Sequence, residues 1–223
     1  MAALNLLLLF IVGSFLGVVV ETCFCFLRTG KITSRRGMVY GPFNQVYGFG
    51  AVLLTTALSP LSDKGVWLLF LGSALLGGLF EAACSCVQEA MYGTVSWEYS
   101  GRRFSLLDGR TSLSFMFFWG LLGTAYIGVL HPFLFGLFDQ IPIAVKAPAV
   151  IALSAFLGYD LWLSALAVGR WHRRLEGQAP TKSMDLWLDK CFPDDRMRRI
   201  YPSMMPSPRK KAKSAETKKV LTS

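Results

Sequence analysis

Five blocks of about twenty mainly apolar residues restrict this chain to very few folds. They cover approximately residues 4–27, 43–61, 66–87, 113–138 and 148–168. A helix of about 20 residues crosses the roughly 30 Å hydrocarbon core of a bilayer, where backbone polar groups must be satisfied within the segment. The first block has no basic n-region or cleavage pattern of a signal peptide, so we expect it to be retained. The sequence therefore predicts an all-α membrane protein with five transmembrane helices.

The basic residues divide the loops into two classes. The first loop holds Arg28, Lys31, Arg35 and Arg36, and the third loop holds Arg102, Arg103 and Arg110. The second and fourth loops hold one lysine each, Lys64 and Lys146. More than half of the 23 Lys and Arg residues lie from Arg170 onward. Cytoplasmic loops carry such an excess. We therefore expect a plasma-membrane protein with an outside N-terminus, a transmembrane domain over 1–170 and a basic cytoplasmic tail over 171–223, disordered beyond Pro206.

The net charge of +9 is consequently a topology signal together with a basic tail. The Lys/Arg run is not accompanied by a nucleic-acid recognition motif, so we expect the lipid bilayer and no nucleic acid as partner. A tail bound to the anionic inner leaflet and a solvated tail both remain open.

Two glutamates lie within the apolar blocks, each at the end of a similar string. Leu16–Val20 precedes Glu21, and Leu76–Phe80 precedes Glu81. Asp160, in the last block, is a third acid of this kind. An ionised side chain at the centre of a bilayer costs about 2.5 kcal/mol or more, so it faces the protein interior and marks function. These acids are the first candidates for a functional site, with either a proton- or cation-coupled role or a neutral interhelical hydrogen bond.

The surroundings of the two glutamates suggest a duplicated hairpin. After each glutamate comes a basic loop and then Phe, three residues, an aromatic residue and Gly: residues 43–48 and residues 115–120. Both hairpins would run in the same sense, giving a parallel repeat, and transporters place sites at repeat interfaces. Arg36 and Arg110, at the helix entrances, are candidate partners of Glu81 and Glu21, with the pairing left open.

Four of the five cysteines form Cys-x-Cys pairs, Cys23/Cys25 and Cys84/Cys86. Such pairs can bind a soft metal or accept lipid. Cysteine is also a common buried apolar residue, and histidine or further sulfur ligands are missing nearby. The structural interpretation is favoured, so no metal or cofactor is expected.

The loops carry further candidate residues. Tyr40 and Tyr47 fit the aromatic belt at the membrane interface. The third loop contains Trp97-Glu98-Tyr99-Ser100 and then the turn Asp108-Gly109-Arg110, in which Asp108 and Arg110 can form a local ion pair. Trp119 lies in the Phe-Trp-Gly string that opens the fourth block. The functional candidates are therefore Glu21, Glu81, Asp160, Arg36, Tyr40, Tyr47, Trp97, Tyr99, Asp108, Arg110 and Trp119, none of them assigned as catalytic.

These motifs occur together in one known family. The run Arg-Gly-x-x-Tyr-Gly-Pro-x-x-x-x-Tyr-Gly-x-Gly over residues 36–50, Trp-Glu-Tyr-Ser, Asp-Gly-Arg, Phe-Trp-Gly and His-Pro resembles the bacterial putative ABC-transporter permease type IV family over roughly residues 10–135. The family pattern often has Asp and Asn where this chain has Glu98 and Asp108. Both departures are conservative.

The resemblance implies a membrane subunit of an ATP-driven transporter, without a defined substrate. The chain has no Gly-x-x-x-x-Gly-Lys-[Ser/Thr] loop, so a separate ATPase subunit would be needed. Five helices also imply a homo-oligomer or larger assembly. Two alternatives remain open: a membrane scaffold or sensor, and an intramembrane lipid-modifying enzyme with the acids as acid and base. Because no catalytic signature is present, a transport role is favoured over an enzymatic one.

Overall fold

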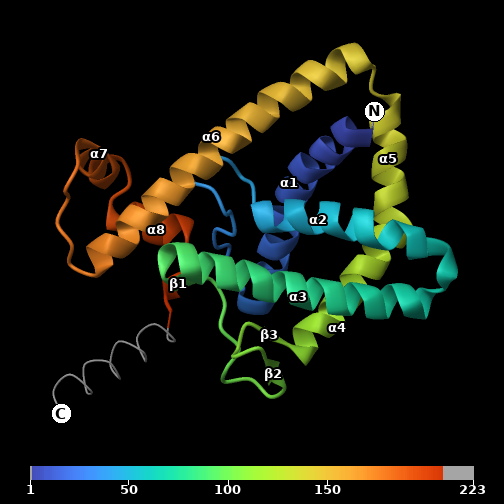
Figure 1. Ribbon diagram of the computed structural model, residues 1–223, viewed down its shortest axis with the longest axis horizontal. Coiled ribbons are helices and arrows are strands. Elements are labelled where there is room, and N and C mark those ends of the chain that lie inside the picture. The colour runs from blue at the N-terminus through green and yellow to red at the C-terminus, as the bar shows by residue number, and fades with distance from the viewer. Residues whose placement is uncertain (1, 208–223) are drawn as a thin grey trace.

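The computed structural model describes residues 2–207, which form long helices and four very short strands (Figure 1). In chain order the elements are α1 (Ala2–Thr29), α2 (Gln45–Leu58), the 3₁₀-helix η1 (Ser59–Lys64), α3 (Val66–Tyr92), β1 (Thr94–Val95), β2 (Ser105–Leu106), β3 (Thr111–Ser112), α4 (Leu113–Ala125), the π-helix η2 (Tyr126–Leu130), α5 (His131–Gln140), α6 (Ile143–Leu175), α7 (Ser183–Cys191), α8 (Asp194–Ile200) and β4 (Met205–Pro206).

Within residues 2–207, four helical stretches are long and apolar enough to cross a membrane: Ala2–Thr29, Val66–Tyr92, Leu113–Gln140 and Ile143–Leu175. The third of these is one continuous stretch made of α4, η2 and α5. The mainly helical membrane fold is therefore confirmed. The predicted block 43–61 forms α2, whose 14 residues are fewer than the roughly 20 a spanning helix needs. Pro60 opens η1 directly after α2, so a fifth span remains a prediction.

Helix α6 is much longer than its predicted block. It begins at Ile143, directly after Pro142, and accommodates Pro148 in its second turn. Its 33 residues correspond to about 50 Å at 1.5 Å per residue, well beyond the roughly 30 Å hydrocarbon core. The domain boundary expected at residue 170 therefore falls inside a continuous helix, whose last turns pack on α7 and α8 through residues such as Val168 and Trp171.

The membrane helices pack as two neighbouring hairpins. Helix α1 packs on α2, α3 packs on α4, and α2 lies against α3 between the two pairs. A core of Leu9, Leu54, Leu69 and Ile127 fills the space between them. On α3, large apolar side chains at four-residue spacing face outward: Leu71, Leu75 and Leu79 are 62%, 56% and 52% exposed. These exposed apolar side chains are therefore expected to face lipid.

The first loop and β1, at the start of the third loop, lie next to the C-terminal segment (Figure 1). The Ser34 hydroxyl donates to the Ile200 carbonyl at 3.1 Å, and the Tyr201 hydroxyl donates to the Gly37 carbonyl at 3.2 Å. Strand β4 pairs antiparallel with β1 after the third helix. Residues 176–207 thus contact both loops. Residues 208–223, which include most of the tail expected to be disordered, lie outside the described chain.

Candidate functional site

Glu21, on α1, is held by the loop that leads into α2. The Arg35 guanidinium lies 3.7 Å from its carboxylate, the Asn44 amide donates to it at 3.4 Å, and Tyr47 is a further hydrogen-bond partner. Asn44 is placed by its role as N-cap, since its side-chain oxygen accepts from the Val46 backbone N–H at 3.2 Å. The loop that ends in this cap therefore also supplies the partners of the carboxylate.

Glu81, on α3, is surrounded by neutral hydrogen-bond donors. The Tyr99 hydroxyl donates to one carboxylate oxygen at 2.9 Å and the Thr111 hydroxyl to the other at 2.8 Å. Trp119, on α4, is a third partner. Glu81 is only 8% exposed, and within residues 2–207 no Lys or Arg forms an ion pair with it.

A glycine one turn before each glutamate lets an aromatic ring from the neighbouring helix approach. A Cβ atom on Gly17 would lie 2.2 Å from the Tyr47 ring, and one on Gly77 would lie 2.5 Å from the Trp119 ring. Each ring is also a hydrogen-bond partner of the glutamate next to that glycine. Small residues allow such close helix approach in lipid.

Tyr47 links the two acids. It hydrogen-bonds Glu21 and interacts electrostatically with Glu81, and it also interacts electrostatically with Tyr99, a direct partner of Glu81. Glu21, Tyr47, Glu81, Tyr99 and Trp119 thus form a single polar cluster between the two hairpins, which we call the glutamate cluster.

The third loop positions Tyr99 through two sequence motifs that fold against each other. The Tyr99 backbone N–H donates to the Gly109 carbonyl at 2.9 Å, and the Trp97 indole donates to the Arg110 carbonyl at 3.1 Å. Asp108 lies in the intervening turn with φ of 54°. Burial, followed by the charge of Glu81, raises the pKa of Tyr99, so its hydroxyl keeps its proton.

Neither of the predicted arginine partners, Arg36 and Arg110, forms an ion pair with Glu21 or Glu81 in the described chain. Arg110 pairs with Glu89, and its other amino group lies 3.4 Å from the Ser85 hydroxyl. Arg36 donates to the Tyr40 carbonyl at 3.4 Å. Arg35 is the partner of Glu21 instead. A loop has no fixed side-chain period, so the sequence could not distinguish Arg35 from its neighbour.

Asp160 has a different environment from the glutamates. It is fully buried and accepts hydrogen bonds from the backbone N–H groups of Tyr40, at 3.1 Å, and Gly41, at 2.7 Å. Ser164, one turn further along α6, accepts the Val39 N–H at 2.9 Å. The first loop is thereby fixed to α6 by three backbone donors.

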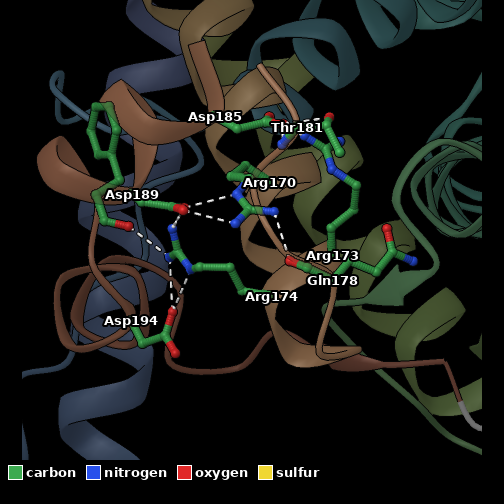
Figure 2. A network of polar contacts seen from close by, with 9 residues as sticks. Arg170, Arg173, Arg174, Gln178, Thr181, Asp185, Asp189 and Asp194 are labelled. Carbon is green, nitrogen blue, oxygen red and sulfur yellow. Dashed lines mark hydrogen bonds and ion pairs between the residues drawn. The ribbon is translucent and has the colours of Figure 1, made fainter. Parts of the chain in front are cut away.

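The end of α6 is joined to the C-terminal segment by an arginine–aspartate network, shown in Figure 2. Arg170, only 2% exposed, donates twice to Asp189, at 2.8 and 2.7 Å. Arg174 bonds the same carboxylate and also Asp194. These hydrogen bonds, led by Arg170, lower the pKa of Asp189 to about 2.

The cysteine pairs do not form a common centre. Cys25 is buried and lies 3.2 Å from the Thr33 hydroxyl and 3.0 Å from Arg35, whereas Cys23 and Cys86 are exposed. Among residues 2–207, the His, Cys, Asp and Glu side chains do not gather in a group of three that could hold a metal ion.

Together these features define a multi-pass helical membrane protein with acidic side chains inside the bundle. The sequence profile of the family described as "Putative ABC-transporter type IV" matches residues 8–165, so the chain belongs to that family. The resemblance expected from the loop motifs is thereby confirmed. Neither a curated protein nor a solved structure matches the chain. The match ends before the C-terminal segment.

Proposed function

We propose that this protein is a membrane-embedded transport subunit whose glutamate cluster lies on the path of the transported species. The observation that carries the proposal is the position of Tyr47, which hydrogen-bonds the acid of one hairpin and interacts with the acid of the other. Membership of an ABC-transporter-related family supports a transport role. Acids within membrane helices are retained for function because they are costly there.

The two hairpins are proposed to be a duplicated unit. Three contacts between α1 and α2 support this, because each has a counterpart between α3 and α4 at a constant distance along the sequence. The contact of Gly48 with Phe10 corresponds to that of Gly120 with Phe70. The contact of Gly13 with Ala51 corresponds to that of Ser73 with Gly123, and the contact of Gly17 with Tyr47 to that of Gly77 with Trp119. Composition bias alone does not align contacts across two helix pairs in this way. The glutamate cluster would then lie at the interface of two repeats, where transporter sites occur.

The proposed topology has the N-terminus outside and the basic end in the cytoplasm. Its support is that each Arg-rich loop contacts the C-terminal segment, the first through Ser34 and Gly37 and the third through β1, so the two loops are proposed to share one side. Helix α2 has about 21 Å of length, and η1 adds about 12 Å if aligned with it. The two together are long enough for the return crossing that this topology requires.

An ABC-type mechanism would need an ATPase subunit, which we propose docks on this cytoplasmic end. A second copy of the chain would complete a full-sized membrane domain. Affinity purification of the full chain in a mild detergent, with identification of stable partners, tests this part. An ATPase is the expected partner. Recovery of the chain with other proteins, and never an ATPase, would favour the scaffold or sensor role and overturn the proposal.

The role of the acids is tested in the recovered complex. Glu21→Gln and Glu81→Gln should each reduce ATP hydrolysis by the complex in proteoliposomes and change the metabolite content of expressing cells. Asp63→Asn is the matched control, because Asp63 is an exposed acid in η1 and lies outside the cluster. Unchanged turnover and metabolite content in both Gln variants would exclude the glutamate cluster from the transport path.

A further inference from the structure

The three intramembrane acids differ in the kind of donor that holds them. Asp160 accepts from two backbone N–H groups, which can only donate, and from the Ser164 hydroxyl at the longer distance of 3.4 Å. Glu21 faces Arg35 and the Asn44 amide, which also can only donate, and Tyr47 is its further hydrogen-bond partner. The carboxylate oxygens of Glu81 accept from two hydroxyl groups, those of Tyr99 and Thr111, and a hydroxyl can act as donor or acceptor.

This difference determines which acid can bind a proton without a rearrangement of the chain. At Asp160 the two shorter hydrogen bonds come from N–H groups fixed in the backbone, so a proton there would displace one of them or depend on the longer contact with Ser164. A proton on Glu81 can instead donate to the Thr111 oxygen, because that hydroxyl rotates about its Cβ–Oγ bond and becomes the acceptor. The carboxylate and one proton become a neutral carboxyl group, and no heavy atom has to move.

The charges around Glu81 leave room for one positive charge. Glu21 faces the guanidinium of Arg35, whereas Glu81 forms no ion pair with a Lys or Arg of residues 2–207, so its negative charge is uncompensated. Cys84 on α3, Tyr47 on α2 and Tyr99 on the third loop are the nearby titratable groups. Arg102 lies 5.6 Å from the centre of the Tyr99 ring, and Arg110 is occupied by Glu89.

The same geometry argues against a larger cation at Glu81. The two hydroxyl hydrogens and the Trp119 side chain are directed at the carboxylate, so they occupy lone pairs that a metal ion would need. Hard cations take about six oxygen ligands. Within residues 2–207, the oxygen atoms that hydrogen-bond Glu81 are the hydroxyls of Tyr99 and Thr111, whereas a proton needs only one acceptor.

We infer that Glu81 is a reversible proton-binding site inside the membrane domain, whereas Asp160 anchors the first loop to α6. This inference rests on the proposed function for its physiological meaning, because it makes the proton the species handled at the glutamate cluster. Its chemistry can be examined in the isolated chain, without any transported solute or ATPase.

Infrared difference spectroscopy of the purified full-length protein between alkaline and acidic pH tests the site. The C=O stretching band of a protonated buried carboxyl should appear on acidification in the wild type and in Asp160→Asn. Glu81→Gln should lose it, and Thr111→Val should shift its frequency because the hydrogen-bond partner is lost. A band that survives Glu81→Gln, or the lack of any pH-dependent band in the wild type, overturns the inference.

The test does not depend on the folding of one variant. Wild-type protein carrying glutamate labelled with ¹³C at the side-chain carboxyl should show the band at a lower frequency, and a band unmoved by the label would exclude every glutamate. Glu21→Gln in the same labelled background should retain it. Because ATPase recovery does not enter this measurement, a failed partner search and a failed proton site are distinguishable.

Discussion

At the scale of single residues, the partners of an acid indicate its role better than its burial does. Asp160 is the most deeply buried of the three intramembrane acids, yet its backbone donors give it the role of an anchor for the first loop. The sequence identified all three acids because a carboxylate in an apolar block is rare. It could not predict their donors, because Tyr99 and Thr111 come from a loop whose conformation depends on left-handed residues such as Asp108.

Gly77→Ala tests the close approach of Trp119 to α3. The added methyl group would lie 2.5 Å from the indole ring, so the helices must separate or the ring must move. Overpacking of this kind costs about 1–3 kcal/mol. We expect a loss of unfolding free energy of that size in mixed micelles titrated with a denaturing detergent.

Gly158→Ala is the matched control for this substitution. A Cβ atom there meets no heavy atom within 4 Å, and Gly158 also lies within a long membrane helix. It should leave the unfolding free energy within about 0.5 kcal/mol of the wild type. Equal effects of the two substitutions would show that Trp119 does not pack on Gly77.

At the scale of elements, the long helices followed from the apolar blocks, but their ends did not. Helix α6 continues to Leu175 past Arg170, the last residue of the expected membrane domain, and through Arg174, which the block criterion assigns to the tail. These arginines stabilise the extension because aspartates of α7 and α8 return to them. The returning partners lie far along the chain, so local sequence could not predict the extension.

Lowering the pH should release the C-terminal segment from α6. The pKa of Asp189 is about 2 in the folded protein, below its ordinary value near 3.8, so the unfolded segment binds the proton more readily. Its stabilising contribution is therefore complete above about pH 4 and is lost as the pH falls towards 2. Hydrogen exchange of residues 176–207 should accelerate over that range.

Asp189→Asn should reproduce the release at neutral pH, because Arg170 then loses its ionised partner. Glu176→Gln, which removes an exposed carboxylate at the end of α6, serves as the comparison. Slow exchange of the segment in Asp189→Asn at neutral pH, equal to that of the wild type, would show that the network does not hold the segment.

At the scale of the whole molecule, the distribution of basic residues predicts that the first and third loops share a side. In the structure both loops contact the C-terminal segment. Two of the motifs that indicated the family, Trp-Glu-Tyr-Ser and Asp-Gly-Arg, pack against each other in the third loop, as the contact between Tyr99 and Gly109 shows. The number of crossings remains a prediction because of the short α2.

Cysteine labelling tests the orientation directly. With a membrane-impermeant maleimide, Ser62→Cys in η1 should be labelled in intact cells, and Gly101→Cys in the third loop only after permeabilisation. The wild-type protein, with its native thiols, gives the background. Labelling of both positions in intact cells, or of Gly101→Cys alone, would contradict the proposed topology.

The central claim is that Glu21 and Glu81 belong to one site joined through Tyr47, and a double-mutant cycle tests it most directly. The unfolding free energies of Glu21→Gln, Glu81→Gln and the double variant should be non-additive by about 0.5–3 kcal/mol, as for residues of one network. The coupling should fall in a Tyr47→Phe background. A cycle of Glu81→Gln with Asn5→Ala, about 24 Å along α1 from Glu21, should be additive. Additivity of the two glutamate substitutions would contradict the account.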